Sequence, residues 1–189
     1  MKSVYGLVAV SLLMAGCGGS APAEPETPSQ MPYGTLAQMM RVIPFPASNV
    51  VYEASTTDPA APPEEAGTGG GSRYSNLYGG WEAVVNAGVA MQETANLLRI
   101  PGRVCENGRP APQGDETFQR GIQALIDAGT ATIAAGEAAV FDEDALFELT
   151  DVVTNACSTC HEVYRDPPSG DTADRCIPEA ELPAADAGE

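Results

Sequence analysis

The residues whose types and spacing point most directly to chemistry are Cys157, Cys160 and His161, the last being the only histidine in the chain. They stand in the order Cys-Ser-Thr-Cys-His, which is the spacing at which c-type haem is attached to a protein. Each thiol adds to one vinyl group of the porphyrin, and the imidazole of the histidine binds the iron as the proximal ligand. We therefore expect one haem c per chain, held by one short helical stretch.

Two other kinds of site use a pair of closely spaced cysteines. A thioredoxin-like dithiol places the pair near the start of a helix in a βαβ unit, whereas a structural zinc site needs a second pair of ligands nearby. The sequence shows neither context, because strand-like alternation and a second ligand pair are both absent. Haem attachment is the preferred interpretation, and the dithiol and zinc sites remain its alternatives.

The N-terminal residues indicate export from the cytoplasm. An apolar run that ends at Met14 is too short to span a bilayer, so residues 1–16 are predicted to be a signal peptide. Its end resembles a bacterial lipobox, which predicts lipidation of Cys17, with simple secretion and a free thiol as the alternative. Residues 17–32 are rich in Pro, Ala, Ser and Glu and are predicted to form a flexible tether.

The net charge and the predicted compartment together limit the kinds of partner that the protein can bind. The net charge is -17, which makes nucleic acid an improbable ligand. We expect a periplasmic lipoprotein that is tethered to a membrane through its lipid anchor. Gly18, rather than aspartate, follows the predicted lipidation site, and this favours the outer membrane. The expected partners are a redox protein and, as an alternative to a monomer, a second copy of the chain in a homodimer.

The first helical pattern after the tether covers residues 34–54. Pro44 and Pro46 must break or kink it, so its second piece is expected at residues 48–54. The polar stretch over residues 55–72 is predicted to be a loop.

Three further helical patterns lead to the motif. The second pattern covers residues 79–99, and Asp115 is a plausible N-cap for the third. The fourth begins near Asp142 or Asp144 and continues directly into the Cys-x-x-Cys-His sequence. Residues 33–166 are therefore expected to form an all-α domain, followed by an acidic tail. Glycines inside these helices suggest close helix contacts or room for a bulky ligand, namely Gly88, Gly121, Gly129 and Gly136.

With four helices and the sequence Cys157-x-x-Cys160-His161-x-x-Tyr164-Arg165 near the end of the last one, the chain resembles cytochrome c′, the class II c-type cytochromes. The resemblance implies an antiparallel, left-twisted four-helix bundle with the haem inside it. It also implies that the cysteines hold the porphyrin, that His161 binds iron and that Arg165 lies beside this histidine. The chain departs from the family pattern in its proline-broken first helix, its long following loop and two extra cysteines, Cys105 and Cys176.

The sixth iron ligand divides the possible functions. Bis-histidine ligation is excluded by the single histidine, so the candidates are methionine, water, a small gas or an empty site. In an up-down bundle the start of the first helix lies level with the haem, and Met40 is preferred over Met39 because it shares a helix face with Leu36 and Ile43. The alternative is that both methionines only pack the core.

We expect a monohaem c-type cytochrome that carries single electrons on the outer side of the cytoplasmic membrane, a function that a methionine ligand would suit. The alternative is a five-coordinate haem protein that binds NO or CO, which an open site would suit. An enzymatic function is not expected, because no second histidine is available for acid and base chemistry.

The two extra cysteines are expected at the same end of the antiparallel bundle as the haem. Cys105 lies between the second and third helices, and Cys176 lies just beyond the fourth. In an oxidising periplasm a disulfide between them would stabilise the fold by about 4 kcal/mol in the chain-entropy model. Two separate thiols are the alternative. Near the same end lie Arg99, Arg103 and Arg109, for which pairing with a haem propionate or, as the default, with surface carboxylates is expected.

Overall fold

The computed structural model describes residues 30–61 and 79–182, and these are helical without any strand. The predicted all-α class is confirmed. The signal peptide, most of the tether, much of the loop at 55–72 and the end of the predicted tail at 167–189 lie outside the described residues. The elements in chain order are α1 Leu36–Val42, α2 Pro44–Ala54, α4 Trp81–Leu98, α5 Glu116–Ala138, α6 Glu143–Cys160, the π-helix η1 His161–Arg165, and the 3-10 turns η2 Thr172–Asp174 and η3 Glu179–Glu181.

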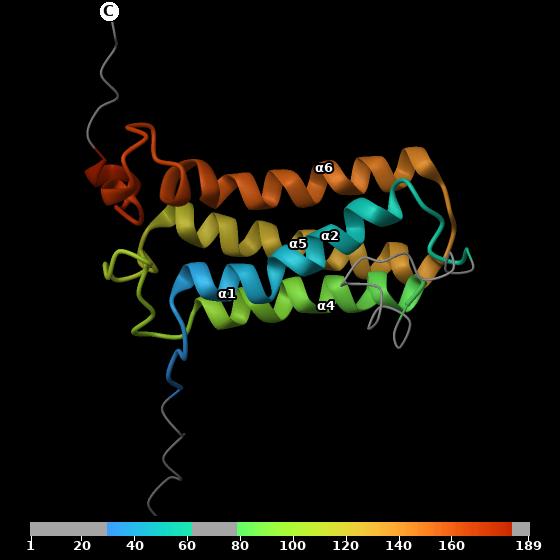
Figure 1. The fold of residues 1–189 in the computed structure, drawn as a ribbon, viewed down its shortest axis with the longest axis horizontal. Helices are drawn as coiled ribbons and strands as arrows, with labels where there is room; N and C mark the ends of the chain where they lie inside the picture. Colours follow the sequence, from blue (N-terminus) through green and yellow to red (C-terminus); the bar gives the residue numbers. More distant parts are fainter. Residues whose placement is uncertain (1–29, 62–78, 183–189) are drawn as a thin grey trace, which may run out of the picture.

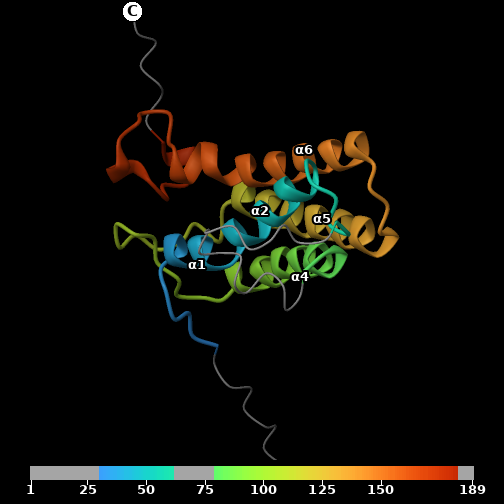
Figure 2. The same cartoon turned by 45° about the vertical axis from the view of Figure 1, so that its right-hand side comes forward.

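The long helices lie side by side, and each reverses the direction of the one before it (Figure 1). Helix α5 packs against both α4 and α6, and α2 lies across α4 and α6. Both views show that α1, the α4–α5 connection and η1 meet at one end of the molecule (Figures 1 and 2). This end is called the motif end below. None of the helices within the described ranges has the length and apolar character needed to cross a membrane.

The first helical pattern breaks at the proline that was expected to interrupt it. Thr35 caps α1 in a reciprocal capping box with Gln38, and α1 ends at Val42. Ile43 joins the helices, and α2 begins at Pro44 rather than at the predicted Ser48. The correction has a simple cause, because the first turn of a helix needs no backbone N–H donors and therefore tolerates both prolines.

Aspartate caps define the starts of the third and fourth predicted helices, and the second, predicted over 79–99, is α4. The Asp115 carboxylate accepts a hydrogen bond from the backbone N–H of Thr117 at 2.8 Å, and α5 follows. The Asp142 carboxylate accepts one from the backbone N–H of Ala145 at 3.1 Å, and α6 follows. These bonds satisfy donors that the first turn of a helix leaves unpaired. The expected N-cap of the third pattern and the earlier of two expected starts of the fourth are both confirmed.

Glycines allow α4 and α5 to approach closely. A Cβ added at Gly88 would lie 2.6 Å from the Gly129 carbonyl oxygen, and one added at Gly129 would lie 2.7 Å from the Gly88 carbonyl oxygen. A Cβ at Gly136 would lie 2.7 Å from the Val85 side chain. Each distance is shorter than real Cβ contacts, so these three glycines serve the helix contact that the sequence suggested.

We expect Gly88→Ala to destabilise the protein by about 2 kcal/mol, because overpacking against backbone atoms costs about 1–3 kcal/mol and exceeds the helix propensity gained. Gly114→Ala is the matched control, since a Cβ there meets nothing within 4 Å. Urea unfolding of both variants measures the difference. Equal unfolding free energies for Gly88→Ala and the wild type would contradict the close contact.

Candidate functional site

Helix α6 carries the Cys-x-x-Cys-His motif at its C-terminal end. Its buried face is formed by Leu146, Leu149, Val153 and Ala156, which repeat at intervals of three and four residues. One further interval of four places Cys160 on the same face, toward the core. Both cysteines are partly buried and pack against the main hydrophobic cluster. The helix therefore delivers the two thiols along its apolar stripe.

The backbone widens into a π-helical turn at His161. The carbonyl oxygen of His161 accepts a hydrogen bond from the N–H of Asp166 at 2.7 Å, five residues ahead. Such turns are rare and occur often at functional sites. Here the wider turn keeps Tyr164 in the core at 4 % exposure, while His161 remains half-buried. No sequence signal identified this turn beforehand.

Gly121 of α5 leaves space beside the Cys160 thiol. A Cβ built at Gly121 would overlap the Cys160 sulfur, so any larger residue there would displace this thiol. Gly121 is one of the glycines expected from the sequence to allow a close helix contact or a bulky ligand. In the structure it lies directly against the thiol of the second cysteine of the motif.

Burial shifts the ionisation of all three motif residues. Burial, and to a smaller extent Cys157, raise the pKa of Cys160 to about 11. Burial likewise raises the pKa of Cys157, and the charge of Arg165 partly opposes this. The pKa of His161 is lowered by burial first and by Arg165 second, against the opposite effect of Asp166. At neutral pH the imidazole is therefore uncharged, which is the form that binds a metal.

Tyr164 and Arg165 flank the histidine in different ways. The Tyr164 ring packs edge-on against Phe118 with 5.6 Å between ring centroids, and burial, followed by the Asp115 carboxylate, raises its pKa above the ordinary value. It is therefore neutral at physiological pH. Arg165 is exposed and donates to the Asp166 carboxylate, its Nε lying 2.7 Å from the oxygen. Its charge acts on His161, in line with its expected place beside this residue.

The two methionines of α1 are not equally buried. Met39 is 7 % exposed and belongs to the main hydrophobic cluster, whereas Met40 is only partly buried and packs against that cluster. Met40 was preferred from the sequence because it shares a helix face with Leu36 and Ile43. These three side chains do pack together against the cluster but are only partly buried, whereas Met39 is buried within it.

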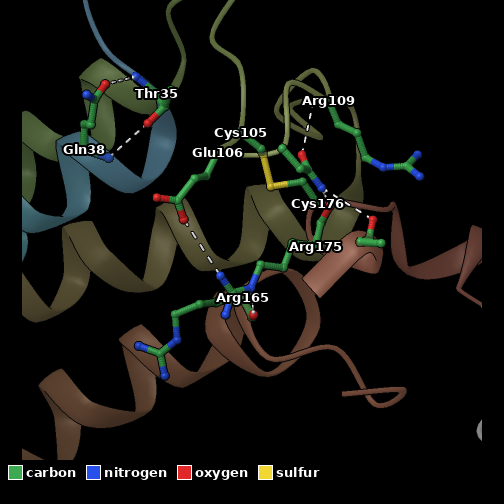
Figure 3. The surroundings of a disulfide bond; sticks show 10 residues. Thr35, Gln38, Cys105, Glu106, Arg109, Arg165, Arg175 and Cys176 are labelled. Atoms are coloured by element: carbon green, nitrogen blue, oxygen red, sulfur yellow. Dashed lines mark hydrogen bonds and ion pairs between the residues drawn. A yellow bond between two sulfur atoms is a disulfide. The ribbon is translucent and has the colours of Figure 1, made fainter. Parts of the chain in front are cut away.

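The predicted disulfide between Cys105 and Cys176 is present at the motif end (Figure 3), with 6.5 Å between the two Cα atoms. Arg103, close to Cys105 in the α4–α5 connection, is 5 % exposed. It donates hydrogen bonds to the carbonyl oxygens of Gly34 and Leu97, at 2.9 and 3.2 Å. The default expectation of surface pairing with carboxylates is therefore wrong for Arg103, because its guanidinium is buried against backbone oxygens.

Among the described residues, positive charge lies at the motif end. The arginines there belong to elements that meet at this end, namely Arg41, Arg99, Arg103, Arg109, Arg120, Arg165 and Arg175. Helices α4, α5 and α6 carry only carboxylates as charged groups beyond Arg120 on α5. Three of these arginines were expected as a cluster from the sequence, and the fold adds the others because it brings α1 and the residues after α6 to the same end.

Comparison with models of known protein families, with curated proteins and with solved structures found no match. The described residues contain no group of three or more His, Cys, Asp or Glu side chains that could hold a metal ion. They therefore provide no ligand set for structural zinc. The Cys-x-x-Cys pair also lies at the end of α6, whereas a thioredoxin-like dithiol lies near a helix start.

In haem-free protein we expect alkylation of Cys160 to accelerate about tenfold per pH unit between pH 8 and pH 10, because only the thiolate reacts and its pKa is about 11. Peptide-resolved mass spectrometry after timed iodoacetamide treatment measures the rate. A rate that levels off below pH 9 would show that the thiol is not buried as described.

Proposed function

We propose that this protein is a monohaem c-type cytochrome that carries single electrons on the outer side of the cytoplasmic membrane. The observation that carries the proposal is the arrangement of Cys157, Cys160 and His161 at the end of a core-packed helix, with the second thiol resting on Gly121. Bound haem would supply a one-electron iron couple. The chain's part is to hold the porphyrin, orient the imidazole and keep water from one side of the site.

The residues present fit this cofactor. The thiols are free, partly buried and placed along one helical stripe, and the neutral form of His161 is favoured by burial. The Cys160 sulfur lies where a side chain at position 121 would be, so Gly121 permits this placement of the thiol. Apolar and aromatic neighbours such as Phe118 and Tyr164 line the adjacent core, which is the low-dielectric setting that helps to set a haem potential.

The same observations weigh against a redox-active dithiol. Oxidoreductase thiols need a depressed pKa, which a helix N-terminus or a neighbouring cation provides. Here Cys160 lies at a helix C-terminus, and burial and Cys157 raise its pKa to about 11. A thiol of this kind is a poor nucleophile near neutral pH.

The alternative function is NO or CO binding by five-coordinate haem. It differs from electron transfer mainly in whether a methionine of α1 ligates the iron opposite His161. The burial of Met39 in the cluster that also receives Cys157 and Cys160 favours the electron carrier, and it moves our preference for the distal ligand from Met40 to Met39.

Membrane attachment is part of the proposal. The signal peptide and the lipidation of Cys17 rest on the sequence alone. The chain enters the described fold beside Gly34, whose carbonyl oxygen is held by Arg103 at 2.9 Å, and this is the motif end. A lipid-anchored protein would therefore carry its haem at the end nearer the tether, within reach of membrane-bound redox partners.

Optical spectra of protein matured in a host with c-type haem assembly test the function. We expect a low-spin spectrum with a methionine-to-iron charge-transfer band and no response to CO. Met39→Leu should abolish the band and create a CO response, because leucine keeps the apolar volume but has no sulfur. Met40→Leu is the matched control and should leave both readings unchanged.

Three outcomes would revise the proposal. A high-spin wild-type spectrum that shifts with CO would move the function to gas binding. Loss of the band only in Met40→Leu would return the ligand role to the residue preferred from sequence. Protein without covalent haem would refute the proposal itself.

A further inference from the structure

Five consecutive residues of the α4–α5 connection, 103–107, touch both sides of the motif end. We call them the clamp, and we call residues 166–182, which follow η1, the strap. Each clamp residue makes a contact with α1 and its entry, with the end of α4, or with the strap. The clamp therefore connects two parts of the chain that are far apart in sequence.

On the α1 side, the contacts fix the start of the helix. Arg103 donates to the Gly34 carbonyl oxygen at 2.9 Å, and the Val104 carbonyl oxygen accepts from the N–H of Leu36 at 2.8 Å. Glu106 pairs with Arg41 near the end of α1 at 3.1 Å. The guanidinium of Arg103 also donates to the Leu97 carbonyl oxygen of α4 at 3.2 Å, so α1 is held to the body of the bundle.

On the strap side, the contacts are covalent and polar. The Cys105–Cys176 disulfide joins clamp and strap (Figure 3). The Asn107 side-chain amide donates to the carbonyl oxygen of Arg175 at 3.0 Å, and Glu106 lies 3.8 Å from the Arg175 guanidinium.

The strap in turn holds the end of η1. The N–H of Cys176 donates to the Tyr164 carbonyl oxygen at 3.0 Å. The Arg175 Nε donates to the Arg165 carbonyl oxygen at 2.7 Å. These carbonyls belong to the last turn of a helix, where no partner within the helix is available. The strap thereby supplies hydrogen-bond donors to the backbone carbonyl oxygens of Tyr164 and Arg165, just after His161.

We propose that the clamp is a positioning element that sets the separation of α1 from η1, the two elements that would face the iron from opposite sides, with the Cys105–Cys176 bond as its main link. The inference rests on the proposed function, and it adds that residues outside the haem motif control the sixth coordination position. Without the link, the strap and α1 would move independently, and the separation between the methionines of α1 and His161 would vary more.

The contacts are not of equal strength. Arg41 and Glu106 are 65 % and 50 % exposed, and exposed ion pairs contribute little. Arg103 is buried and donates to two partly buried carbonyl oxygens, so its replacement leaves both without this donor. The disulfide and Arg103 should therefore dominate, and Glu106 offers a matched variant that removes only the exposed pairs.

Hydrogen–deuterium exchange of the full mature chain tests the coupling and does not require haem. In Cys105→Ser/Cys176→Ser, exchange should accelerate about tenfold or more both in residues 161–178 and in residues 34–43, although the second segment contains no cysteine. Glu106→Gln should change either segment by less than about twofold. Acceleration confined to residues 161–178 would overturn the proposal.

A second variant keeps the test decisive if the double-serine protein does not fold. Arg103→Gln should accelerate exchange in residues 34–43, and unchanged exchange there would overturn the role of the clamp on α1.

In haem-loaded protein, the double-serine variant should lose low-spin character and gain a CO response, whereas Glu106→Gln should not. Spectra identical to wild type would overturn control of the sixth position. If the wild type carries no covalent haem, the proposed function fails while the exchange result still decides whether the clamp couples the two segments.

Discussion

The burial of one face of α6 against α5 is the constraint on which the rest of the structure depends. Leu146, Leu149 and Val153 are nearly inaccessible to solvent, and burying such side chains contributes about 1.5–3 kcal/mol each. Because the stripe repeats without interruption, it fixes the rotation of α6 about its own axis up to its last residue. That rotation decides which way the Cys160 thiol faces, and Gly121 decides how close α5 can come to it.

The motif end is held by interactions that differ in kind from those of the core. A disulfide, a buried guanidinium and hydrogen bonds to helix-terminal carbonyls replace the apolar contacts found along the helices. Chain ends and long connections cannot supply a continuous apolar face, so covalent and polar links must hold them together. Each arginine of the described residues lies at this end, which leaves the remaining surface of the long helices acidic.

Much of the fold followed from periodicity and capping residues. The aspartates at 115 and 142, the proline break after Ile43 and the apolar stripe of α6 were all visible as sequence patterns. The exact start of α2 was not visible, because a proline can either end a helix or stand in the first turn of the next one. The preference between Met39 and Met40 also changed, because both are apolar and only tertiary packing shows that Met39 is the more deeply buried of the two.

Only part of the candidate site could be predicted from the sequence. The cysteines and histidine stand out by spacing alone, and the pairing of Cys105 with Cys176 followed from helix order. The π-helical turn, the overlap between Gly121 and Cys160, and the burial of Arg103 depend on tertiary contacts between segments distant in sequence, which a local pattern does not encode.

The proposed function requires a covalent bond between haem and both Cys157 and Cys160. Intact-mass measurement under denaturing conditions, on protein matured with c-type haem assembly, detects this bond. We expect the wild-type chain to carry the mass of one haem through denaturation, and Cys157→Ala/Cys160→Ala to show only its polypeptide mass. A wild-type chain that shows only its polypeptide mass, with both thiols free, would contradict the proposed function.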